Sequence, residues 1–286
     1  MNQHVTSSPT DWSAEPTTPP KWRRSTWPLW LFFATVFLIY LRDLPAMVLM
    51  MLGESGVISQ QSGALLTSLT LLTLSVLAAS LAPGRLTSDH LGLRGAPIRQ
   101  VIIWTVIALV ALYVPVFLGN AVSGSGSQDT SGLLGAGLAN NLAMVLTVAA
   151  IGPLAEEVAF RGVLFRAAAD GLARWLSPRV AAGLAMLASS FVFMVVHVGA
   201  PPWQLLAYFL FGVALCAGYW WTGSLLVALV PHLLNNAYAC VRMALDAQAG
   251  PLVLAASILA PVLGVALALA LKASLARGRV AAAQVA

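Results

Sequence analysis

Long apolar runs recur along the whole chain and are separated by short polar stretches. Each run is close to the ~20 residues that cross a bilayer as an α-helix. The pattern therefore predicts an all-α polytopic membrane protein with about eight transmembrane helices. The predicted spans are 27–50, 61–82, 99–120, 138–160, 180–198, 203–221, 224–244 and 251–271.

The first of these spans is interrupted by polar residues. Arg42, Asp43 and Pro45 all fall inside it. A helix that ends near Leu41, followed by a segment 44–52 at the membrane interface, is therefore the alternative to one continuous span.

Basic residues occur in alternate loops. Twelve of the fifteen Lys and Arg residues lie in the N-terminal tail, before span 99–120, between 166 and 179, and after 271. The positive-inside rule places such loops, and hence both termini, in the cytoplasm. The net charge of +5 thus indicates orientation in a bilayer, and no nucleic-acid partner is expected.

Composition agrees with this class of protein. Hydrophobic residues make up 59% of the chain and charged residues only 9%, against about 25% charged in soluble domains. Arg exceeds Lys and Ala is abundant, which suggests a GC-rich bacterial genome and so a bacterial plasma membrane. The polar segment 1–24 is expected to be a disordered cytoplasmic tail, 25–275 the transmembrane domain and 276–286 a cytoplasmic C-terminal tail.

Three ionisable residues lie within span 138–160 or at its end: Glu156, Glu157 and Arg161. A charge inside a membrane costs roughly 2.5–3.5 kcal/mol even on insertion scales and indicates function by default. Glu157 and Arg161 are four apart, so they share a helix face and can pair. Glu156 points about 100° away and is the candidate general base. A structural ion pair plus an interfacial Glu is the alternative. Gly152–Pro153 should loosen the helix one turn earlier.

Two other spans carry rare polar residues. His197 ends span 180–198, and His232 and Asn236 lie four apart in span 224–244. A hydrogen-bonded core histidine and hydrogen bonding between helices are the structural alternatives. Three spans with such groups predict one buried polar cavity.

These residues form three ordered motifs: Glu156–Glu157–x–x–x–Arg161, Phe193–x–x–x–His197 and His232–x–x–x–Asn236. The motifs resemble those of the CPBP family of CAAX-protease and bacteriocin-processing membrane proteins, also called Abi or Rce1-like. The resemblance covers about 138–245. It implies an intramembrane endopeptidase that acts on membrane-associated peptides or proteins.

The chemistry of peptide hydrolysis suits these residues. Glu156 and His197 would hold and deprotonate a water. His232 and Asn236 would donate hydrogen bonds to the tetrahedral oxyanion. The supporting residues would be Glu157 and Arg161, which fix the helix and its charge balance, and Phe193, which orients His197.

Several alternatives stay open at this point. Glu156, His197 and His232 also form a ligand set that catalytic zinc accepts, although the chain has no His-Glu-x-x-His helix. The resemblance implies a glutamate-type protease without a cofactor. A non-proteolytic membrane scaffold or immunity factor, or a proton-coupled transporter using Glu156, are the other functions considered. The CAAX name does not fix the substrate.

Overall fold

The computed structural model describes residues 27–52, 60–82, 86–123, 134 and 137–283. This part of the chain is helical and contains no β-strand. The predicted tail, 1–24, lies outside it. The helices are α1 (Trp30–Leu41), α2 (Leu44–Leu52), α3 (Gln60–Ser80), α4 (Ile98–Ser123), α5 (Leu138–Leu146), α6 (Gly152–Glu157), α7 (Arg166–Leu172), α8 (Pro178–Val195), α9 (Pro202–Thr222), α10 (Leu225–Asp246) and α11 (Pro251–Ala283), with π-helical stretches η2 (Thr147–Ile151) and η3 (Val158–Phe165).

Eight runs of helix in the described residues are long and apolar enough to cross a membrane, which confirms the predicted all-α polytopic fold. In the first span α1 ends at Leu41 and α2 begins at Leu44, but Trp30–Val48 across this break still counts as one of the eight runs. An interfacial position for 44–52 stays a prediction. The last helix continues past the predicted end at 271 as far as Ala283.

The fourth span differs most from its prediction of 138–160. Helix continues from Leu138 to Leu172 over 35 residues, through α5, η2, α6, η3 and α7. Every residue of η3 is buried, so neighbouring helices shield its polar groups from lipid. That burial lets the helix continue past Arg161, where hydropathy alone ends the span.

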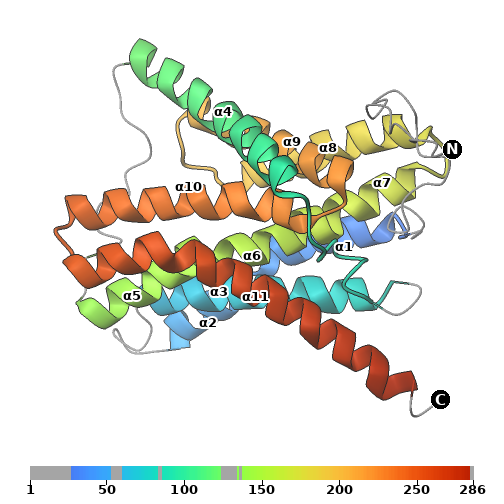
Figure 1. The fold of residues 1–286 in the computed structure, drawn as a ribbon, viewed down its shortest axis with the longest axis horizontal. Coiled ribbons are helices and arrows are strands. Elements are labelled where there is room, and N and C mark those ends of the chain that lie inside the picture. Colours follow the sequence, from blue (N-terminus) through green and yellow to red (C-terminus); the bar gives the residue numbers. More distant parts are fainter. Residues whose placement is uncertain (1–26, 53–59, 83–85, 124–133, 135–136, 284–286) are drawn as a thin grey trace, which may run out of the picture.

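The helices lie mostly along the long axis of the molecule, with α10 between α9 and α11 (Figure 1). Helix α4 crosses this direction and packs on α9 and α10. The α5–α7 run is central, since parts of it contact α1, α3, α8, α10 and α11.

One end of the bundle is fastened by loop 86–97. The Leu225 amide donates to the Gly92 carbonyl at 2.7 Å, and Arg94 Nε donates to the Gly223 carbonyl at 2.6 Å. Gly92 has φ +67°, a left-handed conformation that glycine adopts without steric cost. The loop is therefore hydrogen-bonded to the turn between α9 and α10.

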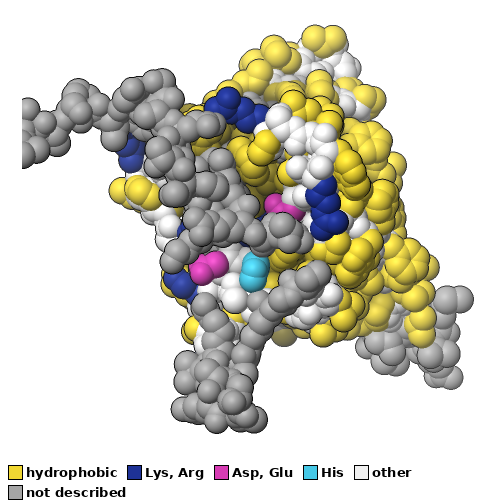
Figure 2. Space-filling view, turned by 90° about the vertical axis from the view of Figure 1, so that its right-hand side faces the viewer, with side chains coloured by type: hydrophobic (Ala, Val, Ile, Leu, Met, Phe, Trp, Pro, Cys, Tyr) yellow, Lys and Arg dark blue, Asp and Glu magenta, His cyan; other side chains and the backbone are white. Residues whose placement is uncertain are grey.

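Basic side chains gather at this same end. Arg166 at the start of α7 donates to the carbonyl oxygens of Asp89 and His90. The Trp27 amide donates to Asp170 at 3.3 Å, which ties the start of α1 to α7. Figure 2, which looks onto the right-hand end of Figure 1, shows several Lys and Arg side chains on this face.

Candidate active site

The buried ion pair predicted in the fourth span is present. Arg161 Nη1 donates to Glu157 Oε1 at 2.8 Å, and both side chains are almost completely buried. The guanidinium also lies over the Phe193 ring, 4.7 Å from its centroid. Glu157 and Arg161 therefore neutralise each other within the bundle.

His232 joins this pair to the second carboxylate. Its Nδ1 is 2.7 Å from Glu157 Oε1, and its Nε2 is 3.7 Å from Glu156 Oε2. Because a carboxylate only accepts, the Nδ1–H of His232 is the donor. The same Glu157 oxygen thus binds both Arg161 and His232. Glu156 is the more open of the two acids, with 23% of its side chain exposed.

His197 is held on three sides. Its Nδ1 donates to the Phe193 carbonyl at 2.7 Å. The imidazole contacts the Phe193 ring at 4.7 Å and the Tyr208 ring at 4.4 Å between centroids. When His197 is neutral, this tautomer leaves the lone pair on Nε2.

Phe193 is the contact shared by both histidines. Its ring lies 4.7 Å from the imidazole of His197 and 5.9 Å, edge-on, from that of His232. Phe211 of α9 supports the His232 ring at 5.7 Å. The structure therefore brings Glu156 of the fourth span close to His232 of α10 and places His197 against the Phe193 ring that His232 also contacts. That these residues and Asn236 line one polar cavity stays a prediction.

Asn236 lies one turn beyond His232 on α10 but has other partners. Its Nδ2 donates to the Val148 carbonyl of η2 at 2.8 Å, and its Oδ1 accepts from Asn235 Nδ2 at 3.0 Å. These hydrogen bonds do not reach Glu156 or His197. They fix the orientation of the Asn236 amide.

Sequence reasoning missed the aromatic residues of α9. Tyr208 packs on His197 and accepts a hydrogen bond from Gln204 Nε2 at 2.7 Å, while Phe211 packs on His232. Gln204 and Tyr208 are four apart in an apolar span, and this spacing was the available signal. Phe211 gave no signal, because an aromatic residue in a transmembrane helix is ordinary.

A metal ion does not fit the described side chains as they stand. No group of three or more His, Cys, Asp or Glu in the described part of the chain is placed to hold one. The Nδ1 of His232 is directed to Glu157, and that of His197 to a backbone carbonyl. The zinc alternative therefore stays a prediction.

Comparison with known proteins locates this site within a recognised domain. Residues 138–238 match the family model described as Rce1-like, type II CAAX prenyl endopeptidase Rce1-like. The matched segment runs from α5 into α10 and contains the four predicted catalytic residues. No curated protein and no solved structure matches the chain.

Proposed function

The chain carries an Rce1-like domain at residues 138–238, and from that premise we propose that it is an intramembrane endopeptidase cleaving membrane-associated peptides or proteins. The observation that carries the proposal is the 3.7 Å contact of Glu156 with His232, whose ring shares its Phe193 contact with His197. A partly exposed carboxylate next to two imidazoles, inside a membrane bundle, suits the activation of water.

Glu156 is the proposed general base. It takes a proton from a water that also hydrogen-bonds to Nε2 of His197. The resulting hydroxide attacks the carbonyl carbon of the substrate, and the carbonyl electron pair moves onto oxygen. Collapse of this tetrahedral intermediate breaks the C–N bond, and Glu156 returns its proton to the leaving amine. The products are a carboxyl group and an amine.

His232 and Asn236 are the proposed oxyanion donors. To act as an oxyanion donor, His232 must carry a proton on both ring nitrogens, because its Nδ1–H is already used by Glu157. In that state His232 donates from Nδ1 to Glu157 and offers Nε2–H to the developing oxyanion. Asn236 offers the amide N–H that Val148 does not use. Pre-oriented donors of this kind are usually the largest electrostatic contribution to such reactions.

We also propose that the protein lies in a bacterial plasma membrane with both termini in the cytoplasm. The basic loops at one end of the bundle support this orientation. Reporter fusions test it: a fluorescent protein joined after Ala286 should fold, and a periplasmic phosphatase joined after Ser123 should be active. The opposite pair of results would invert the orientation.

The function is tested by comparing membrane proteomes of strains that express wild type, Glu156→Gln or His90→Gln. His90 lies in the loop at the basic end of the bundle and serves as the matched control. We expect cleavage products that appear with wild type and His90→Gln and disappear with Glu156→Gln. Identical products from all three strains would instead favour a scaffold or immunity factor, and proton-coupled uptake in vesicles would favour a transporter.

The purified enzyme then tests the mechanism. We expect it to cleave an identified substrate in the presence of a strong chelator, and to contain no stoichiometric metal. Chelator-sensitive cleavage that zinc restores would make Glu156, His197 and His232 ligands instead. Prenylated and unprenylated versions of the same peptide would show whether a lipid group on the substrate is required.

A further inference from the structure

A directional chain of side-chain hydrogen bonds connects α4 to Asn236. Tyr113 Oη donates to Asn235 Oδ1 at 2.8 Å, and Asn235 Nδ2 donates to Asn236 Oδ1 at 3.0 Å. Asn236 Nδ2 in turn donates to the Val148 carbonyl at 2.8 Å. This hydrogen-bond chain begins on α4, outside the Rce1-like domain, and ends on the π-helical stretch η2.

The backbone of η2 explains why Val148 can accept this bond. The Gly152 amide bonds to the Thr147 carbonyl, five residues back. The next residue, Pro153, has no N–H to donate. The Val148 carbonyl is therefore left without a helical partner, and a carbonyl buried in a membrane needs one. The Asn236 amide supplies it.

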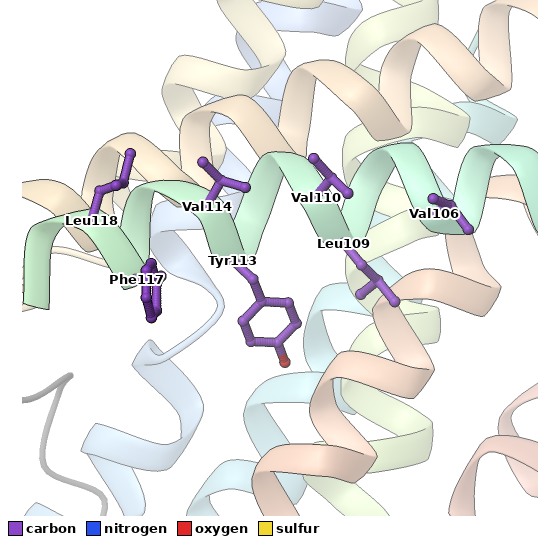
Figure 3. Close-up of a pocket in the computed structure, with 7 residues that line it drawn as sticks. All are labelled: Val106, Leu109, Val110, Tyr113, Val114, Phe117 and Leu118. Carbon is purple, nitrogen blue, oxygen red and sulfur yellow. The ribbon is translucent and has the colours of Figure 1, made fainter. Parts of the chain in front are cut away.

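At the other end of the hydrogen-bond chain, the Tyr113 hydroxyl also requires a hydrogen-bond partner. It lines an apolar groove of about 480 Å³ along α4, and its ring extends from the helix toward the neighbouring helices (Figure 3). The other residues of the groove are Val106, Leu109, Val110, Val114, Phe117 and Leu118. In apolar membrane surroundings a hydroxyl without a partner costs free energy, and the hydrogen bond to Asn235 lowers that cost for Tyr113, which is 37% exposed from the protein.

These contacts restrain both ends of the Asn236 side chain. Asn235 fixes the oxygen, Val148 takes one N–H, and the direction of the second N–H follows from the planar amide. We infer that Tyr113 and Asn235 are positioning residues that aim this N–H at the oxyanion. The inference rests on the proposed function, in which Asn236 is an oxyanion donor. Successive bonds of one direction also polarise one another and strengthen the last donor.

The test is the steady-state kinetics of Tyr113→Phe, which removes one oxygen and keeps the ring. We expect kcat to fall about 3- to 10-fold, the size of one net hydrogen bond, with KM unchanged. Tyr238→Phe is the matched control, because the Tyr238 ring packs edge-on against Tyr113 at 5.9 Å between centroids. The Tyr238 hydroxyl takes no part in the hydrogen-bond chain from Tyr113 to Val148. The kcat of Tyr238→Phe should equal that of wild type.

A second variant tests the hydrogen-bond chain without changing Tyr113. Asn235→Asp still accepts from Tyr113 but cannot donate to Asn236, so its kcat should fall by at least as much. In an Asn236→Ala background, Tyr113→Phe should have no further effect, because the chain acts through Asn236. Equal additional losses in both backgrounds would overturn the inference.

The two proposals fail in different ways. Cleavage by wild type with an unchanged kcat in both Tyr113→Phe and Asn235→Asp would overturn the positioning role alone. An absence of any cleavage that depends on Glu156 would overturn the proposed function, and the positioning role with it. A rise in KM without a fall in kcat would assign Tyr113 to substrate binding and likewise overturn positioning.

Discussion

Exchanging each acid of the Glu156–Glu157 doublet for Gln should have very different effects on stability. The two substitutions are chemically identical and adjacent in sequence, so each is the control for the other. Glu157 is fully buried and accepts from Arg161 at 2.8 Å and from His232 at 2.7 Å. Glu156 is 23% exposed and is 3.7 Å from His232 Nε2, which is too long for a good hydrogen bond.

The expected magnitudes follow from these contacts. Glu157→Gln leaves the buried guanidinium of Arg161 without a counter-charge, and breaking a buried pair in this way costs about 3–5 kcal/mol. Glu156→Gln removes a partly solvated charge and should cost only about 0–1 kcal/mol. A difference of this size corresponds to an apparent melting temperature lower by on the order of 10 °C for Glu157→Gln.

Thermal unfolding of the purified variants in one detergent, monitored by circular dichroism, measures the difference in melting temperature. Adding Arg161→Gln to Glu157→Gln should recover part of the loss, because no unpaired cation then remains. Equal melting temperatures for the two single variants would refute the reasoning. A larger loss in Glu156→Gln would show that the structural and chemical roles of the two acids are exchanged.

Two further predictions concern other parts of the molecule. Asn236→Ala should lower turnover about 100- to 1000-fold, the usual cost of losing one oxyanion donor, with little change in KM; a loss below tenfold in steady-state assays would argue against this role. Gly92→Ala should lower the free energy of unfolding by about 1–3 kcal/mol, because Gly92 has φ +67° and an added Cβ would lie 3.0 Å from the Gly223 carbonyl oxygen. Gly95→Ala, which meets nothing within 4 Å, is its control, and equal melting temperatures would contradict the prediction.

The sequence alone predicted the fold class and the Glu157–Arg161 ion pair of the candidate site. Apolar run length predicts spanning helices because the bilayer sets the length, and helix periodicity predicts the Glu157–Arg161 pair because residues four apart share a face. The break after Leu41 was also readable, because charges and a proline interrupt an apolar run there. Each of these features depends only on residues close together in the chain.

Tertiary packing decided how the components are connected. That His232 shares an oxygen of Glu157 with Arg161, and that Tyr113 reaches Asn236 through Asn235, depends on the depth and rotation of one helix against another. Those quantities follow from the packing of many side chains over the whole bundle. The extension of the fourth span to Leu172 has the same origin: a polar residue ends a membrane helix on a hydropathy scale, but other helices can surround it and remove the cost of lipid contact.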